Sequence, residues 1–215
     1  MHVVAILDHP YGASAHANEP HRRSFSAALL RAALDGITRA GGTSDVIDLV
    51  TDGFDPVMRA EDLADWRRGG STDPQVLDYQ RRLASADHLV LVFPTWWMSM
   101  PAGTKGFLDK VLAKGVAFDE PRPGGALVRR LTRLRGVTVL TPMTTRHGLY
   151  RLFFGRPGHR ILFRGAFALI GVRGLRWFSF EGPAQRSAAW RSARLARVQL
   201  LRALDDLVVS ESLGA

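Results

Sequence analysis

Residues 89–115 of the chain read LVLVFPTWWMSMPAGTKGFLDKVLAKG, and they are the clearest indication of the fold class. The apolar run at 89–93 is typical of a strand that is buried on both faces of a parallel sheet. Two prolines enclose an aromatic turn, and an amphipathic helix begins after Pro101, since proline suits the first turn of a helix. In open α/β sheets, ligands bind at the carboxyl ends of the strands. The two tryptophans of the turn therefore lie where a flat, π-rich ligand is expected.

Strand and helix patterns alternate along the rest of the chain, which predicts a parallel sheet covered by helices on both faces. Strands are expected at 2–8, 44–49, 87–93, 136–141 and 175–180. Helices are expected at 24–40, 74–85, 101–113, 160–170 and 185–209. The sequence contains no internal repeat, linker or low-complexity tract. We therefore expect an α/β three-layer sandwich with a five-stranded parallel sheet, built as one domain from residues 1–215.

Two expected loops are longer than the two to six residues that usually join strands and helices in such folds. They lie at 9–23 and 50–73, and both follow the carboxyl ends of strands. Long loops inside a compact domain are usually functional or disordered. Their position at the binding edge of the sheet favours function.

The amino-acid composition excludes several kinds of site and indicates a protein without a membrane span. The chain of 215 residues has no cysteine, which excludes disulfides, thiolate catalysis and cysteine metal sites, and fits a reducing cytoplasm. The first eight residues indicate a strand and not a signal peptide. No apolar run approaches the 18 residues of a membrane span. We expect a cytoplasmic protein without membrane insertion.

The net charge of +9 comes from 29 basic and 20 acidic residues, and only three of the basic residues are lysines. A basic surface attracts anions such as dinucleotide phosphates or nucleic acid. The alternative is an arginine-rich bias of composition with no particular partner. Because the arginines are scattered over several helices without interleaved aromatic residues, we expect no nucleic-acid binding.

The loop after the first strand and the helix that follows it form a candidate phosphate site. A helix N-terminus offers unpaired N–H groups and the positive end of the helix dipole. Ser24 and Ser26 add hydroxyl donors, and His9, Arg22 and Arg23 add charge. The simpler interpretation is that Ser24 only caps the helix. Neither a Walker nor a Rossmann glycine motif follows the first strand.

Two other kinds of chemistry find little support. A metal hypothesis rests on four side chains near the first loop, but their spacing is not helical and no cysteine joins them. These are His9, His16, Glu19 and His21. No Gly-x-Ser-x-Gly elbow supports a serine hydrolase. Lys105 and Asp109 are spaced as a pair on one helix face and not as catalytic groups. We expect no metal site.

Five motifs, in order, carry a resemblance to a known family. They are His9-Pro10, the run RRSFS at 22–26, Asp48-Leu49, FDPV at 54–57 and the tryptophan loop with its helix at 94–115. Together they cover most of residues 1–120, and they resemble the flavodoxin-like NAD(P)H:quinone oxidoreductases of the flavodoxin-2 type. The resemblance implies a flavodoxin-like fold, a homodimer, and a flavin-dependent enzyme. Such an enzyme passes hydride from NAD(P)H through tightly bound FMN or FAD to a quinone-like acceptor.

The resemblance also implies where the flavin lies. Its phosphate would be held by Ser24, Phe25 and Ser26 beside His9, although the family usually has asparagine at the position of Ser26. Its ring would contact a second set of residues at the ends of two later strands. These are Pro94, Thr95, Trp96, Trp97, Met98, Thr144 and Thr145. The alternative for Trp96 and Trp97 is packing in the core or in a dimer interface.

The loop at 141–150 departs from the family, which commonly has Thr-Thr-Gly-Gly there. This chain has Arg146 and His147 in place of the paired glycines. The resemblance assigns Tyr150 and His159 to stabilising charge on the reduced flavin, with His147 and Arg146 as rivals for the same task. Tyr150 as an ordinary packing residue is the alternative.

Two alternative functions belong to other classes of protein. One is a regulatory flavoprotein subunit, similar to the ancillary proteins of bacterial potassium-efflux systems, with a membrane protein as partner. The other is a flavodoxin fold that binds a planar ligand without redox chemistry.

Overall fold

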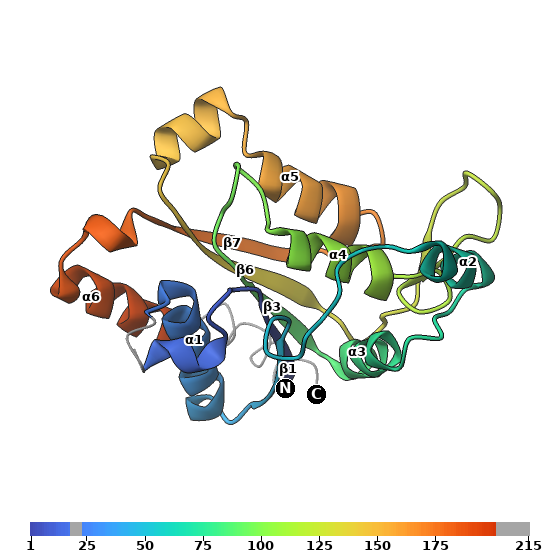
Figure 1. The fold of residues 1–215 in the computed structure, drawn as a ribbon, viewed down its shortest axis with the longest axis horizontal. Helices are drawn as coiled ribbons and strands as arrows, with labels where there is room; N and C mark the ends of the chain where they lie inside the picture. Colours follow the sequence, from blue (N-terminus) through green and yellow to red (C-terminus); the bar gives the residue numbers. More distant parts are fainter. Residues whose placement is uncertain (18–22, 201–215) are drawn as a thin grey trace, which may run out of the picture.

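The computed structural model describes residues 1–17 and 23–200, and a five-stranded parallel sheet lies at its centre (Figure 1). The strand order is β2-β1-β3-β6-β7, and all four neighbouring pairs are parallel. The strands are β1 (His2–Leu7), β2 (Thr43–Asp48), β3 (His88–Val92), β6 (Gly136–Met143) and β7 (Gly174–Glu181). The order reverses direction beside β1, so the carboxyl ends of β1 and β3 flank the point where open α/β sheets bind ligands.

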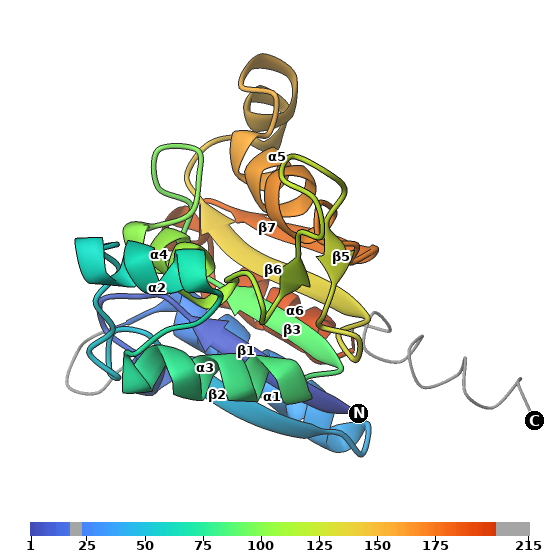
Figure 2. The ribbon, with the colours of Figure 1, turned by 90° about the vertical axis from the view of Figure 1, so that its right-hand side faces the viewer.

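Helices cover both faces of this sheet (Figures 1 and 2). On one face lie α1 (Phe25–Arg39) and α6 (Ala188–Gln199), which contact each other. The other face carries α3 (Pro74–Ser85), α4 (Ala102–Val111) and α5 (Pro157–Leu162), and α5 continues into the π-helix η3 (Phe163–Phe167). The three-layer α/β sandwich expected from the sequence is confirmed.

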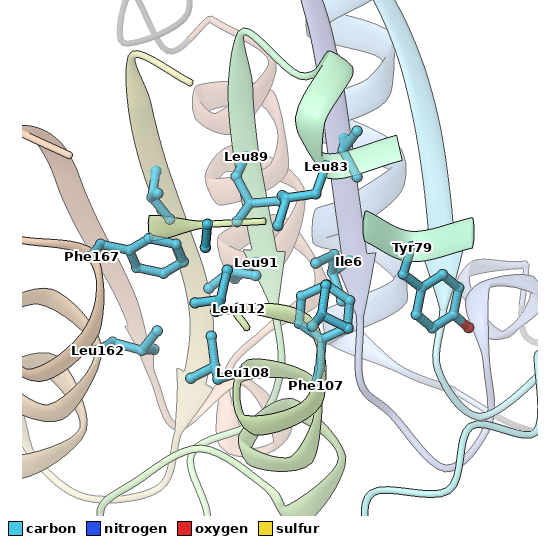
Figure 3. Close-up of a cluster of buried hydrophobic side chains, with 14 of the residues drawn as sticks. Ile6, Tyr79, Leu83, Leu89, Leu91, Phe107, Leu108, Leu112, Leu162 and Phe167 are labelled. Carbon is cyan, nitrogen blue, oxygen red and sulfur yellow. The ribbon is translucent and has the colours of Figure 1, made fainter. Parts of the chain in front are cut away.

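Two apolar clusters fill the spaces between the layers. Alternate residues of one strand contribute to opposite clusters, as the two-residue period of a strand requires. In β3, Leu89 and Leu91 face the larger cluster under α4, whereas Val90 and Val92 face the cluster under α1. Figure 3 shows part of the larger cluster, where Phe107 and Leu108 of α4 lie over the sheet. All of β3 is buried, which is why its sequence is almost continuously apolar.

Local signals fix the ends of the helices. The Ser24 side chain accepts a hydrogen bond from the Ala27 N–H at 3.1 Å, so Ser24 is the N-cap of α1. Asp73 caps α3 in the same way, with Pro74 at the first helical position. Gly106 allows α4 to approach the preceding loop closely, because a Cβ there would lie 2.4 Å from the Cα of Pro56.

His88, the first residue of the central strand β3, is a buried polar group. It lies at the amino ends of the strands, away from their carboxyl ends. Its Nε2 lies 2.9 Å from the Thr138 hydroxyl, and its Nδ1 has no partner among the described residues. Burial lowers the pKa of His88 to about 4, and the positive charge of Arg176 acts in the same direction. The imidazole is therefore neutral in the folded protein at pH 7.

The element boundaries differ from the prediction in three places. The segment 50–73, expected to be a loop, contains a helix, α2 (Ala60–Arg68). The expected helix at 160–170 begins earlier, and α5 and η3 divide it. The last helix was expected to run to 209; α6 ends at Gln199, and residues 201–209 lie outside the described part of the chain.

Smaller elements add to the expected set. A short antiparallel pair, β4 (Phe118–Asp119) with β5 (Val128–Arg129), follows α4. The 3-10 helix η1 (Ala13–His16) lies in the first long loop, and the π-helix η2 (Leu149–Phe153) follows β6. The 3-10 helix η4 (Pro183–Gln185) precedes α6. In the described ranges, no helix is long and apolar enough to cross a membrane.

Candidate functional site

The loops after β1, β3 and β6 meet at the carboxyl edge of the sheet and carry nearly all the candidate residues. The first of these loops is anchored by a buried carboxylate of the neighbouring strand β2. Asp48 accepts hydrogen bonds from the Ala13 N–H at 2.6 Å and from the Thr51 hydroxyl at 2.8 Å. The start of the loop is thereby held against the sheet, although residues 18–22 lie outside the description.

His9 stands at the start of this loop with a defined donor atom. Its Nδ1 accepts a hydrogen bond from the Tyr11 N–H at 3.2 Å, which leaves Nε2 to carry the proton of the neutral ring. Burial lowers the pKa of His9, and the negative charges of Asp8 and Asp48 partly oppose that effect. A neutral His9 can donate one hydrogen bond to an anionic ligand.

The N-terminus of α1 holds the predicted phosphate residues, and each has a different environment. Ser24 is buried and caps the helix, so the capping role that the simpler interpretation gave it is confirmed. The Ser26 hydroxyl is buried and has no partner among the described residues. Phe25 packs against Phe180 and Trp190, with ring centroids 5.8 and 6.4 Å away. The unpaired Ser26 hydroxyl is the feature that calls for a ligand.

The tryptophan loop forms a tight hairpin whose backbone is strained. The N–H groups of Trp96 and Ser99 each donate to the carbonyl of the other, at 3.0 and 2.9 Å. Both central residues, Trp97 and Met98, have positive φ angles, 47° and 63°. This is the geometry of a type I′ turn, which normally uses Asn or Gly. Strain of this kind persists where the surrounding structure enforces it, often at functional sites.

The hairpin exposes the groups that a planar ligand would use. Trp97 is 98% exposed and Trp96 is 48% exposed, so the alternative that they pack in the core of this chain is wrong. Thr95 donates its N–H to the Pro142 carbonyl, whereas no hydrogen bond among the described residues uses the N–H groups of Trp97 or Met98. Those two amides remain available to a ring edge.

A buried carboxylate fixes the helix that follows the hairpin. Asp8, at the end of β1, accepts hydrogen bonds from the Thr104 N–H at 2.5 Å and from its hydroxyl at 2.8 Å. The Asp8 N–H in turn donates to the Val92 carbonyl at 3.0 Å. Asp8 therefore joins the ends of β1 and β3 to the start of α4, and it sets the spacing between the first loop and the hairpin.

The three predicted catalytic residues line one cavity of about 250 Å³. Tyr150 and His147 come from the segment after β6, and His159 comes from α5. Sequence reasoning missed the other lining residues, Arg151, Arg156, Trp177 and Ser179. Trp177 and Ser179 lie in β7, whose carboxyl end must lie beside that of β6 once the strand order is known. That order was the missing signal for Trp177 and Ser179, whereas Arg151 and Arg156 lie in the segment between β6 and α5.

Tyr150 lies where the hairpin, η2 and α5 meet. A Cβ at Gly158 would be 3.2 Å from the Tyr150 hydroxyl, from the Met98 carbonyl oxygen and from the Ser99 Cα. The hydroxyl is buried and makes no hydrogen bond within the described structure. Burial raises the pKa of Tyr150, while the nearby N–H groups of His159 and Gly158 partly oppose that effect. The phenol is therefore a protonated donor at neutral pH.

The two histidines of the cavity differ in their partners. Burial lowers the pKa of His159, and the positive charges of nearby arginines, first Arg156, act in the same direction. Its ring packs on Phe163 and Trp177. His147 is held against β7, because its ring Nε2 lies 2.9 Å from the Ser179 hydroxyl and its backbone N–H donates to the Glu181 carboxylate at 3.1 Å.

Thr144 and Thr145 connect this cavity to the end of β6. Thr144 is exposed and Thr145 is half-buried. No described hydrogen bond uses the N–H or the side chain of either residue, so both can serve a ligand as donors. The missing paired glycines therefore do not remove hydrogen-bond donors from this loop.

A second groove of about 640 Å³ separates β7 from α6. It is basic and aromatic: Arg186 and Arg194 lie over the Trp190 ring, 5.6 and 5.2 Å from its centroid. Glu181 lies 3.7 Å from Arg186. The sequence indicated only an arginine-rich helix here. His147 borders both cavities, which makes the groove an extension of the same edge of the sheet.

The described residues give the metal hypothesis no support. Across residues 1–17 and 23–200, no group of three or more His, Asp or Glu side chains is arranged to hold a metal ion. Two of its members, Glu19 and His21, lie outside the description. Lys105 and Asp109 form the expected pair on α4, with 2.5 Å between their charged atoms.

Comparison with known proteins adds three findings. A family model described as a flavodoxin-like fold matches residues 1–201. Ribosyldihydronicotinamide dehydrogenase [quinone] of Pongo abelii is 35% identical over 119 residues, which are 46% of this chain and 50% of that protein. The uncharacterized NAD(P)H oxidoreductase YcaK of Escherichia coli K12 is 40% identical over 75 residues, 34% of this chain and 38% of that protein.

Solved structures share the fold over nearly the whole chain. The NAD(P)H:quinone oxidoreductase from Methanothermobacter marburgensis superposes with a TM-score of 0.77 at 24% identity, covering 96% of this chain and 98% of that one. At this identity the likeness concerns the fold alone. In the sequence comparison, the matches span about half the length of the first relatives.

Proposed function

This chain belongs to the family with a flavodoxin-like fold, and from that premise we propose that it is a flavin-dependent NAD(P)H oxidoreductase acting on a quinone or similar electron-poor small molecule. The names of its relatives support a redox enzyme of this class. The observation that carries the proposal is the cavity that Tyr150, His159 and His147 share beside the strained hairpin. Protonated and neutral donors there suit a site that stabilises developing negative charge.

The residues of the carboxyl edge fit a flavin. The helix dipole of α1 and the unpaired Ser26 hydroxyl suit its phosphate, with the Nε2 of His9 as a further donor. The free amides of Trp97 and Met98 suit the edge of its ring system. When bound, flavin supplies the hydride chemistry, while the protein supplies orientation and electrostatics.

Within this assignment, the side chains have separate tasks. The buried Tyr150 hydroxyl has no partner in the described structure and would donate a hydrogen bond to the flavin, and Arg156 lines the same cavity. Burial holds His159 neutral, so it can accept and pass on a proton at neutral pH, while the Ser179 hydroxyl lies 2.9 Å from Nε2 of His147 and fixes that ring in the cavity. Trp97 presents an aromatic face to the acceptor. We also propose FMN or FAD as the bound flavin and a homodimer as the assembly.

The test separates flavin retention from acceptor reduction. We expect purified protein to carry a yellow chromophore, which extraction and mass measurement identify as FMN or FAD. Trp97→Ala is expected to lower quinone reduction about tenfold or more with flavin content retained, because Trp97 touches no core. Ser24→Ala with Ser26→Ala is expected to release flavin, while Ser44→Ala, at an exposed position in β2, serves as the control.

Stability must be measured beside flavin content, since loss of the Ser24 cap alone costs about 1 kcal/mol. Equal loss of flavin in the Trp97 and serine variants would contradict the division of roles. A colourless protein that takes up no added FMN or FAD would point to a planar-ligand protein without redox chemistry. Flavin content without NAD(P)H turnover would point to a regulatory subunit.

A further inference from the structure

Asp8 is a charged residue on a face of the sheet that is otherwise apolar. It follows the last residue of β1 and lies on the same face as Val4 and Ile6, which belong to the larger cluster under α4. Asp8 is only 6% exposed. A carboxylate that is buried to this degree costs free energy unless hydrogen bonds replace those of water. Packing alone therefore does not explain an aspartate at this position.

The hydrogen bonds that replace water come from the first turn of α4. The N–H and the hydroxyl of Thr104 both donate to Oδ2 of Asp8. The N-cap of α4 is Pro101, which makes no side-chain hydrogen bond, and the first N–H groups of a helix have no partner within the helix. Negative charge at this end is also favoured by the helix dipole. Asp8 therefore caps α4 from a different element of the fold.

The chain leaves room for this contact. A Cβ at Gly103 would lie 2.7 Å from Oδ2 and 2.8 Å from Oδ1 of Asp8, so a larger residue would push the carboxylate away from α4. Glycine at a helical position is less stable than alanine, and the contact explains why glycine stands here. Asp8, Gly103 and Thr104 are thus matched to one another, and we call these three residues the Asp8 clamp.

The Asp8 clamp holds both ends of the segment that carries the tryptophan hairpin. The Asp8 N–H donates to the Val92 carbonyl at 3.0 Å, directly before residues 93–103. Its side chain binds Thr104, directly after them. Both residues at the apex of the hairpin have positive φ angles, and a strained turn of this kind persists only when its surroundings hold it. One residue of β1 therefore controls where the hairpin segment begins and ends.

We propose that Asp8 is a positioning residue for hydride transfer, an inference that rests on the proposed function. The chain continues from Asp8 into His9 and the loop that leads to the phosphate site assigned to α1. Through the Asp8 clamp, the same strand end also fixes the hairpin, whose Trp97 and Met98 amides suit the ring edge. Asp8 thereby sets the separation between these two parts of the site. A misplacement of roughly 1 Å is enough to slow such a reaction about a hundredfold.

Amide hydrogen exchange of the full chain, measured by mass spectrometry, tests the clamp without turnover. Asp8→Ala removes the acceptor of both Thr104 donors, so we expect peptides from 93–104 to exchange about tenfold faster or more. Asp8→Asn keeps an acceptor oxygen and should restore most of the protection. The matched control is Asp87→Ala, whose carboxylate accepts the His2 N–H at 2.7 Å at the amino ends of the same two strands. It should leave these peptides unchanged.

Single-turnover reduction of the bound flavin by NAD(P)H tests the positioning itself. Asp8→Ala is expected to slow this step about tenfold or more, with flavin content and the Kd for NAD(P)H little changed. Asp8→Asn should restore most of the rate. A role in stability alone would lower the melting temperatures of Asp8→Ala and Asp87→Ala and leave both rates unchanged.

Three outcomes would overturn the proposal. Unchanged exchange of 93–104 in Asp8→Ala would show that no clamp exists. Faster exchange with an unchanged reduction rate would remove its role in positioning. Asp8→Asn as slow as Asp8→Ala would show that the charge matters and not the hydrogen bonds. If Asp8→Ala does not fold, Thr104→Val, which removes the hydroxyl donor alone, takes its place in both measurements. A wild type that NAD(P)H does not reduce would refute the proposed function and leave the exchange result standing.

Discussion

The buried His88 predicts a specific loss of stability in acid. In the folded protein the pKa of His88 is lowered from 6.5 to about 4, whereas the unfolded chain keeps the higher value. Below pH 6.5 the unfolded state therefore binds a proton that the folded state does not. His88 therefore has no effect on the free energy of unfolding well above pH 6.5. Between pH 6.5 and 4 it lowers that free energy progressively as the pH falls.

The expected magnitude follows from the two pKa values. Integrated down to pH 4.5, the difference in proton binding destabilises the fold by about 2.5 kcal/mol. That is a large fraction of the 5–15 kcal/mol of a typical domain. The Nδ1 of His88 has no partner to accept its proton, so the structure offers no local compensation.

Denaturant unfolding of the wild type and of His88→Gln, each at pH 7.5 and 4.5, measures this effect. Other groups titrate in both proteins, so only the difference between the two pH-dependent losses is assigned to His88. We expect the wild type to lose about 2.5 kcal/mol more than His88→Gln. His16→Gln, at an exposed histidine, is the control and should behave as the wild type. Equal losses in the wild type and His88→Gln would refute the reasoning.

Two further predictions concern the site and the packing beneath it. Tyr150→Phe removes a buried hydroxyl that has no partner, so unfolding free energy should change by less than about 0.5 kcal/mol. Quinone reduction in the same variant should fall by about tenfold to a hundredfold with flavin retained, and an unchanged rate would exclude Tyr150 from the chemistry. Gly106→Ala places a Cβ against Pro56 and should destabilise by about 1–3 kcal/mol in thermal or denaturant melts. Gly70→Ala places its Cβ in open space and should not destabilise the protein by this mechanism. Equal losses of stability in the two variants would contradict the packing argument.

The sequence predicted the sheet because burial on both faces leaves a direct trace. Every residue of β3 is buried, so its apolar run could belong only to an interior strand. The sequence did not predict α2, whose only large apolar residues are Leu63 and Trp66. This helix also begins after Arg59 instead of a typical capping residue. The signals that it does carry are weak ones, namely Asp62 accepting from the Arg59 N–H at its start and Gly69 with a positive φ at its end.

The site was predictable by position but not by conformation. The Trp97 loop could be placed at the end of β3 from its flanking prolines. Its type I′ turn could not, because neither Trp97 nor Met98 favours a positive φ. Likewise, nothing local to Tyr150 indicates that its hydroxyl is buried beside Gly158, since that contact depends on where α5 begins.

The two outer strands, β2 and β7, have a consequence for association between chains. In the described structure each pairs with one neighbour only, so each leaves a row of backbone groups without a strand partner. Free rows of this kind invite intermolecular strand addition and aggregation. Asp45 in β2 is paired with Arg82, and Arg176 lies in β7, so charged groups occupy both rims. Charge at the rims disfavours uncontrolled polymerisation of an otherwise open sheet.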